Sequence, residues 1–139
     1  MEDKNDRTYD TEGYKGRQED IRKLVIKPEL DTIENKYSDR DYIVTLETSE
    51  FVSICPKTGL PDFADITIEY IPSEYLVEEK SLKLYFTAYR DIGIFQEHAT
   101  NKIMDDFVKV VKPKWFKINA VWNQRGGIGV VVNCEWKRK

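Results

Sequence analysis

The chain has 139 residues, which is enough for one domain with a hydrophobic core and too few for a second domain of ordinary size. A formal net charge of −3, on a chain with 34% charged residues, gives no sign of a broad basic face for nucleic acid. Two cysteines are too few for a disulfide framework, no apolar run could cross a bilayer, and the start "MEDKNDRTYD" is unlike a secretion signal, so we expect a cytoplasmic protein.

The first part of the chain, residues 1–40, is polar and highly charged apart from the apolar residues Leu24, Val25 and Ile26. We interpret it as a loosely held arm that docks on the domain or on a neighbouring subunit. The remaining residues, 41–139, are then predicted to form a single domain.

Two strands are expected early in this domain. "DYIVTLE" (41–47) and "ADITIEYIP" (64–72) alternate apolar and polar residues, and Pro72 ends the second. The loop between them, "SICPKTGLPDF" (53–63), contains a cysteine, two prolines, a glycine and an aspartate. A cysteine that only fills space in the core does not need a loop stiffened by prolines, so this loop is a candidate functional site.

The period then changes to that of helices. From Glu78, the residues Leu82, Tyr85, Phe86 and Tyr89 fall at helical spacing and form an apolar stripe. A second helix is predicted over about 97–111, where Pro113 ends it. Its expected stripe is Ile103, Phe107 and Val110.

Two further strands close the chain, because "WFKINAVW" (115–122) and "IGVVVNCEW" (128–136) alternate again, and "NQRGG" supplies the glycines of a hairpin. The order strand, strand, helix, helix, strand, strand predicts an α+β fold: a four-stranded antiparallel sheet with both helices on one face. Such a sheet has two open edges, so we expect oligomers formed through them.

Each candidate site residue also has an ordinary structural explanation. Cys55 is either a nucleophile or a small core residue, while Cys134 lies on an apolar strand face and is expected in the core. Asp62 is either the acid paired with that nucleophile or a turn cap after proline. Glu97 is either a partner for the N–H edge of a guanine-like base or an acid favoured by the helix dipole.

Basic residues suggest anion sites with the same ambiguity. Lys80 and Lys83, with Ser81 between them, could hold the phosphates of a nucleotide cofactor, or they could form a solvated helix face. Arg125 in the glycine hairpin could also meet an anion. His98 is the only histidine, which leaves too few ligands for zinc, and we expect no metal.

Taken together, "CPKTGLPDFADITIEYIP", "VEEKSLKLYFTAYRD", "FQEHATN" and "QRGG" resemble the NADPH-dependent 7-cyano-7-deazaguanine reductases, the nitrile reductases of queuosine biosynthesis. The resemblance covers about residue 40 to the end of the sequence. It implies the tunnelling fold, in which subunits join sheet edges into pentameric barrels. Two pentamers would stack into a decamer, with the substrate pocket between subunits.

The resemblance also implies roles for individual residues. Cys55 would form a covalent thioimide with the nitrile, and Asp62 would protonate the nitrile nitrogen. The implied substrate contacts are Val77, Glu78, Glu79, Gln96 and Glu97. The implied contacts to the cofactor NADPH are Lys80, Ser81, Lys83, Tyr85 and Arg125.

Two positions depart from the family pattern, since Glu79 replaces the usual serine or leucine and Gln96 replaces a common histidine. Neither departure affects the cysteine or its acid, but either could alter the pocket, and His98 could substitute for the missing imidazole. Two alternatives remain open. One is another tunnelling-fold enzyme of purines or pterins, similar to GTP cyclohydrolase, which would need zinc. The other is a ring-forming protein that binds a deazapurine without catalysis.

Overall fold

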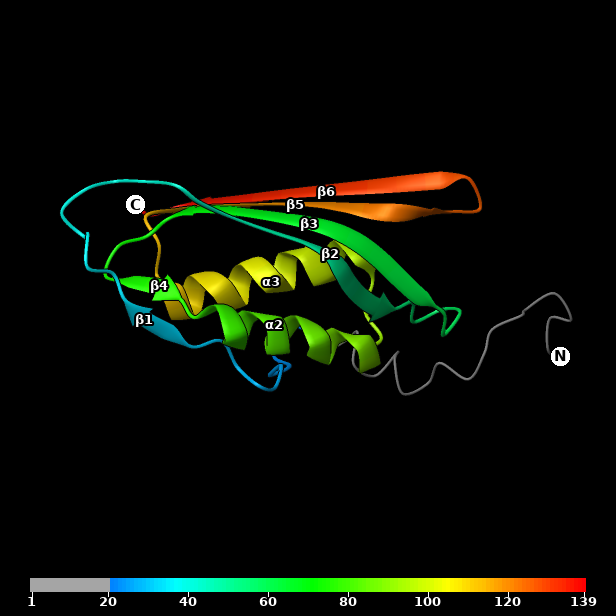
Figure 1. Ribbon diagram of the computed structural model, residues 1–139. Coiled ribbons are helices and arrows are strands. Elements are labelled where there is room, and N and C mark those ends of the chain that lie inside the picture. Colours follow the sequence, from blue (N-terminus) through cyan, green and yellow to red (C-terminus); the bar gives the residue numbers. More distant parts are fainter. Residues whose placement is uncertain (1–20) are drawn as a thin grey trace, which may run out of the picture.

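The computed structural model describes residues 21–139, in which a four-stranded sheet packs against a layer of two helices (Figure 1). Its strands are β2 (Val44–Ile54), β3 (Pro61–Ile71), β5 (Trp115–Arg125) and β6 (Ile128–Lys137). They lie in the order β2-β3-β5-β6, and each pair is antiparallel. The predicted α+β architecture is therefore confirmed.

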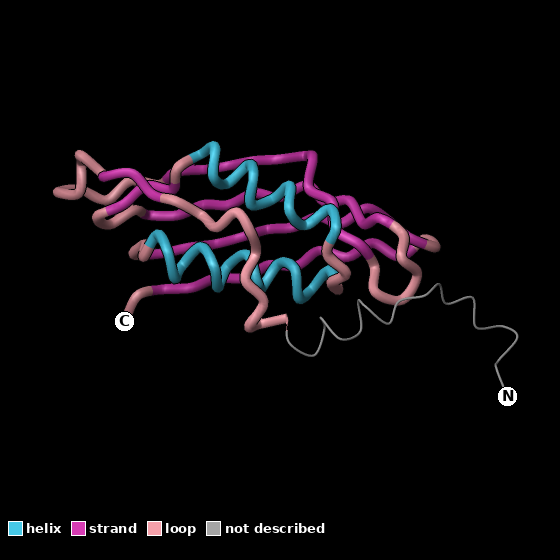
Figure 2. The backbone as a smooth tube through the Cα atoms, turned by 90° about the horizontal axis from the view of Figure 1, so that it is seen from below, coloured by secondary structure: helices cyan, strands magenta, loops and turns pink. Residues whose placement is uncertain are grey.

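The helical layer consists of α2 (Glu79–Ala88), the short 3-10 helix η1 (Tyr89–Asp91) and α3 (Gln96–Val111). Both α2 and α3 lie on the same face of the sheet and run in opposite directions (Figures 1 and 2). Among the described residues, no helix is long and apolar enough to cross a membrane.

The alternating residues of the strands and the helical stripes form one core between the layers. The side chains of Ile66, Ile68, Phe116 and Ile118 are almost completely buried on the sheet side. Helix α3 packs over β5 and β6 with four buried residues at helical spacing: Ala99, Ile103, Phe107 and Val111. The predicted stripe was correct at two positions, whereas Val111, rather than the partly buried Val110, completes it.

A second, two-stranded sheet was absent from the sequence prediction. Strand β1 (Thr32–Glu34) pairs with β4 (Tyr75–Val77) beside the start of α2. Residues 1–20 of the predicted arm lie outside the described residues. Within residues 21–40, Ile21, Ile26 and Leu30 are buried in the core, and the domain division at residue 40 stays a prediction.

The two ends of the molecule carry different segments (Figure 1). One end holds the β2–β3 turn, the start of α3 and the β5–β6 hairpin. The other end holds the β1–β4 pair, the start of α2 and the end of α3. This division decides which of the candidate residues meet within one chain.

Candidate active site

A six-residue turn, 55–60, joins β2 to β3 and holds Cys55. The backbone amide of Gly59 donates to the Cys55 carbonyl at 2.8 Å, and the Cys55 amide donates to the Leu60 carbonyl at 2.9 Å. Gly59 has a φ of 70°, a left-handed conformation that glycine adopts without steric cost. Cys55 is 8% exposed and is a free thiol. Backbone hydrogen bonds thus fix the position of a largely buried thiol.

Asp62 lies on β3 and not in the loop, because the strand begins at Pro61, earlier than the sequence predicts. It pairs across the sheet with Ser53, and only 2% of its surface is exposed. At that position, Asp62 faces the helical layer, as do the buried residues Ala64 and Ile66 further along the strand. Its carboxylate is therefore buried at the end of the sheet that holds the turn.

Arg125, at the end of β5, connects this carboxylate to the cysteine turn. Its Nη1 lies 2.5 Å from Asp62 Oδ1, and its Nη2 donates to Thr58 Oγ1 at 3.1 Å. The guanidinium is also near enough to the Cys55 side chain to lower the pKa of the thiol. Gly126 and Gly127, with φ values of 59° and 79°, reverse the chain immediately after Arg125. Two hairpins that are far apart in sequence therefore meet through one guanidinium.

These contacts shift the pKa values of both acids toward each other. Burial raises the pKa of the Cys55 thiol, but hydrogen bonds from the Thr58 side chain, from Arg125 and from the backbone of the turn outweigh it and leave the pKa lowered. Burial also raises the pKa of Asp62; the charge of Arg125 opposes the rise, and the negative charge of Glu97 adds to it. A proton on the thiol is thus held less tightly, and one on the carboxyl more tightly, than in water.

The start of α3 borders the same site. The segment before α3 is fixed to the end of β2, where Ile54 donates to the Ile92 carbonyl at 3.0 Å and Ile94 donates to the Ile54 carbonyl at 2.9 Å. Glu97 stands in the first turn of α3 and is exposed, close enough for its charge to affect Asp62. Gln96 begins the helix. The structure therefore brings Glu97 and Gln96 to the same end of the molecule as Cys55 and Asp62.

Two buried polar atoms lie on the same face of the sheet as Asp62. Ser53 Oγ and Trp122 Nε1 have no hydrogen-bond partner among residues 21–139. Ser53 is directly opposite Asp62, and Trp122 is opposite Ala64, one step further along the same face. A buried polar group without a partner costs about 1–3 kcal/mol, so the wall of the site contains donors available to water or to a ligand.

The stretch from Val77 to Ser81 is placed elsewhere, at the start of α2, and much of it supports the helix. Glu78 caps α2, because its carboxylate accepts from the amides of Lys80 at 2.9 Å and Ser81 at 2.6 Å. The hydroxyl of Ser81 donates to the Glu78 carbonyl at 2.7 Å and accepts from the Asp31 amide at 2.9 Å. The roles in substrate and cofactor binding predicted for these residues stay predictions.

Tyr85 is 1% exposed and takes part in a buried polar network between the two helices. Its hydroxyl donates to Asp106 Oδ2 at 2.6 Å and lies 2.9 Å from the hydroxyl of Tyr89. Lys102 Nζ, also buried, contacts Asp106 Oδ1 at 3.0 Å. Within one chain, these contacts account for Tyr85 as a structural residue, and its predicted contact with the cofactor remains untested.

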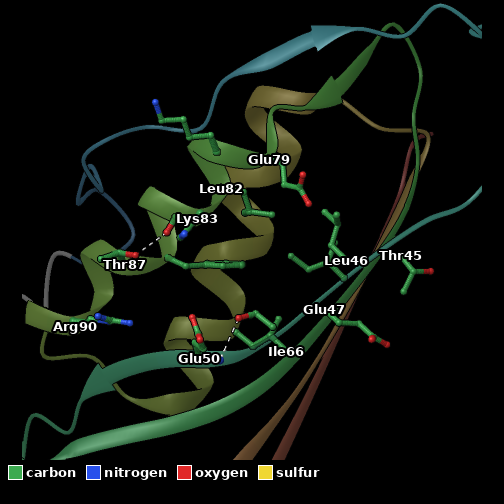
Figure 3. Close-up of a pocket in the computed structure, with 14 residues that line it drawn as sticks. Thr45, Leu46, Glu47, Glu50, Ile66, Glu79, Leu82, Lys83, Thr87 and Arg90 are labelled. Atoms are coloured by element: carbon green, nitrogen blue, oxygen red, sulfur yellow. Dashed lines mark hydrogen bonds between the residues drawn. The ribbon is translucent and has the colours of Figure 1, made fainter.

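A groove of about 770 Å³ lies between α2 and the strands β2 and β3 (Figure 3). Its floor includes Leu46, Ile66 and Ile68, and Leu82 of α2 points toward Leu46 across it. Charged side chains of both signs line the rest: Glu47, Glu50, Glu79, Lys80, Lys83 and Arg90. Lys80 and Lys83, which the sequence suggested as phosphate ligands, thus border one groove.

The predicted site residues fall into two groups within one chain. The β2–β3 turn, the start of α3 and the end of β5 lie at one end of the molecule, whereas β4 and the start of α2 lie at the opposite end (Figure 1). By their positions in these elements, the first group contains Cys55, Asp62, Gln96, Glu97 and Arg125, and the second contains Val77, Glu78 and Glu79. That helix has 10 residues, so it separates the groups by about 15 Å. One copy of the chain does not bring both groups to one small substrate.

Sequence reasoning missed Thr58 and the position of Arg125 beside the thiol. The threonine within "CPKTGL" gave no signal of its own, since a turn threonine is common. The signal for Arg125 was the "QRGG" hairpin, which indicated an anion site, and the anion that it meets in this chain is the Asp62 carboxylate. Among residues 21–139, no cluster of three metal-ligating side chains occurs.

Comparison with known proteins gives consistent matches. Residues 61–139 match the model of the family described as QueF-like protein. Proteins named NADPH-dependent 7-cyano-7-deazaguanine reductase are similar along most of the chain. The one from Syntrophus aciditrophicus is 49% identical over 86% of this chain and 91% of its own length. Those from Chloroherpeton thalassium and Thermoanaerobacter pseudethanolicus are 53% and 44% identical, over 81% and 100% of this chain and 97% and 99% of theirs.

A solved structure shares the fold. The crystal structure of the archaeosine synthase QueF-Like in the apo form superposes with a TM-score of 0.61 at 26% sequence identity. The match covers 67% of this chain and 91% of that one. The layered sheet and helices described above are therefore those of this structural neighbour.

Proposed function

Because the chain belongs to the QueF-like family, whose similar members are named NADPH-dependent 7-cyano-7-deazaguanine reductases, we propose that it reduces the nitrile of 7-cyano-7-deazaguanine to a primary amine. The product is 7-aminomethyl-7-deazaguanine, an intermediate of queuosine tRNA modification. The observation that carries the proposal is that Arg125 forms an ion pair with the buried Asp62 and contacts the turn that holds Cys55, where the pKa of the thiol is lowered and that of the carboxyl is raised.

This pair suits addition of a thiol to a nitrile. A nitrile carbon is a weak electrophile, and a thiolate attacks carbon well near neutral pH. In the proposed step, Cys55 Sγ bonds to the cyano carbon while a proton from Asp62 goes to the nitrogen, which gives a thioimide without leaving charge on nitrogen. The stiff turn matters because a misplacement of about 1 Å can cost on the order of 100-fold in rate.

NADPH, when bound, supplies the two hydrides that a nitrile needs to become an amine. The basic side chains of the groove suit this cofactor, because Lys80, Lys83 and Arg90 border a space of about 770 Å³ and can pair with phosphates, while the acidic side chains of the same groove remain available to hydroxyl groups. Burial of Cys55 and Asp62 keeps water from the intermediates, and an imine in particular hydrolyses readily.

The division of candidate residues between two ends supports a site built by two chains. We propose that Cys55, Asp62 and Glu97 of one protomer face Val77, Glu78 and Glu79 of another. Glu97 would accept the N–H edge of the deazaguanine, since a carboxylate matches two parallel donors. The open edges of the sheet, β2 and β6, supply the surfaces for a ring, and a decamer of two stacked pentamers is the assembly we propose.

Three further points complete the proposal. Residues 41–139 would form the catalytic domain, and residues 1–40 would be an arm that packs partly on it. We propose the cytoplasm as the location of the reaction, which suits a small substrate and NADPH. No direct contact with nucleic acid is required, because the net charge is −3 and the substrate is a free base.

The experiment that tests this function follows NADPH oxidation at 340 nm after addition of 7-cyano-7-deazaguanine, with the product identified by mass. Two NADPH per amine are expected, and Cys55→Ala should remove activity while the same change at Cys134 should not. Zinc-dependent turnover of a purine triphosphate would instead favour a relative of GTP cyclohydrolase. Binding of the deazapurine with no oxidation would favour a non-catalytic binding protein.

A further inference from the structure

We propose that Arg90 binds the 2′-phosphate of NADPH and so makes the protein prefer NADPH to NADH. The inference rests on the proposed function, because it takes the groove between α2 and β2 as the cofactor site. It adds a residue that the sequence resemblance did not include among the cofactor contacts. The 2′-phosphate is the only chemical difference between the two nucleotides, so a residue that selects NADPH must act on that group.

Three of the cofactor contacts that the resemblance implies already have partners within the chain. The Arg125 guanidinium pairs with the buried Asp62. The hydroxyl groups of Ser81 and Tyr85 take part in the hydrogen bonds described above. Within residues 21–139, three cationic side chains line the groove without an ion-pair partner, and these are Lys80, Lys83 and Arg90.

Arg90 is the best match to the 2′-phosphate among these three cations. That group is a phosphate monoester, which carries a charge of about −1.5 to −2 at pH 7. A guanidinium can donate two parallel N–H bonds to two of its oxygens, whereas a lysine ammonium acts as a point charge. Arg90 is exposed on η1, at one end of the groove, where it faces Glu50 of β2 (Figure 3).

The spacing of Lys83 and Arg90 suits the two anionic parts of NADPH. Helix α2 passes directly into η1, because Ala88 and Tyr89 both have right-handed helical backbone angles. The two cations are seven residues apart, so they lie on the same helical face at about 10 Å along the axis. The diphosphate and the 2′-phosphate of NADPH are attached to the same ribose. Lys83 can therefore hold the diphosphate while Arg90 holds the 2′-phosphate.

The proposed two-chain site sets the direction of the cofactor in the groove. Glu79 and Arg90 lie at opposite ends of the groove (Figure 3). The nicotinamide must lie at the Glu79 end, because that end faces Cys55 of another protomer in the proposed site. The adenosine half then lies toward Arg90, and the partly buried ring of Phe86 in the groove wall offers its base an aromatic surface.

The acidic side chains of the groove make the loss of Arg90 more costly. A register shift in β2 between Thr48 and Phe51 marks a bulge that contains Glu50, and Glu47 lines the same side of the groove. Carboxylates accept hydrogen bonds from ribose hydroxyl groups but repel a phosphate. Without Arg90, the 2′-phosphate would lie beside these carboxylates with no cation to offset the repulsion, so the preference for NADPH should be lost.

The test measures the dissociation constants of NADPH and NADH for the full chain without nitrile, by titration followed through the fluorescence of the reduced nicotinamide. In Arg90→Gln, the Kd of NADPH should rise about 10- to 100-fold, as expected for the loss of hydrogen bonds between charged groups, while the Kd of NADH should change less than about threefold. Arg90→Lys should restore part of the affinity for NADPH. Arg40→Gln, an exposed arginine outside the groove, is the matched control and should change neither constant.

Lys83→Gln is the comparison within the groove and should raise both constants by a similar factor, because both nucleotides contain the diphosphate. The ratio of kcat/KM for NADPH to that for NADH should follow the ratio of affinities. Three results would each overturn the inference: an equal loss for both nucleotides in Arg90→Gln, a loss selective for NADPH in Lys83→Gln alone, or no preference for NADPH in the unmodified protein. A selective loss in Arg90→Gln without any nitrile reduction would refute the proposed function and leave the assignment of Arg90 intact.

Discussion

Replacing Tyr85 by phenylalanine separates two accounts of this residue. The resemblance in sequence predicts that Tyr85 contacts the cofactor. In the structure, its hydroxyl is buried and forms hydrogen bonds with Asp106, at 2.6 Å, and Tyr89, at 2.9 Å. The change removes only the hydroxyl, so the ring keeps its packing. What is lost is a donor to a carboxylate that also pairs with the buried Lys102.

The expected loss of stability follows from the negative charge of the Asp106 carboxylate. A hydrogen bond to a charged group contributes about 1.5–3 kcal/mol, and no water replaces it at a position 1% exposed. We expect Tyr85→Phe to lower the free energy of unfolding by about 2 kcal/mol, or the Tm by several degrees. The KM for NADPH should stay the same.

The assay is urea unfolding followed by tryptophan fluorescence at one protein concentration, together with NADPH kinetics. Tyr37→Phe is the matched control, because Tyr37 is 59% exposed and its change should alter stability by less than about 0.5 kcal/mol. A normal stability with a raised KM for NADPH in Tyr85→Phe would refute the structural account and support the contact with cofactor.

Three further predictions concern the acid, the assembly and the turn. The pKa of Asp62 is higher in the folded protein than in the unfolded chain, so the contribution of this residue to stability is lost as pH rises through the folded-state pKa. Asp62→Asn, which cannot ionise, should therefore raise the Tm at pH 7 and have little effect near pH 4. An equal change of Tm at both pH values would contradict this. Co-assembly of Cys55→Ala with Lys83→Glu should restore about a quarter of the activity if two chains build each site, and none if one chain does. Gly59→Ala, at a φ of 70°, should cost about 1–2 kcal/mol and slow turnover, while Gly129→Ala, which meets Gln124 only at ordinary contact distance, should do neither.

The sequence predicted the sheet and both helices because their apolar periods are long. Strands β5 and β6 have 11 and 10 residues, so alternation is unmistakable, and the hairpin glycines mark the turn between them. The pair β1–β4 escaped prediction because three residues show no period. The start of β3 was misplaced for a related reason, since Pro61 suggests a loop, although proline is tolerated at the first residue of a strand.

The site was partly predictable, because Cys55 and Asp62 are near in sequence and a hairpin keeps them together. Arg125 is a different case: it reaches them only because β3 and β5 pair in a particular register and because the β5–β6 hairpin ends where the cysteine turn does. No pattern of residue types encodes that meeting. For Tyr85, the sequence leads to two different predictions. Its place in the helical apolar stripe predicted burial in the core, which the structure confirms, while the motif predicted a contact with the cofactor, which stays a prediction.

The most direct test of the central claim is the mass of the intact protein after mixing with 7-cyano-7-deazaguanine and no NADPH. We predict an increase equal to the full mass of the nitrile, located on Cys55, reversed by NADPH and absent in Cys55→Ala. Turnover at a normal rate with no adduct, or with the adduct on Cys134, would contradict the account.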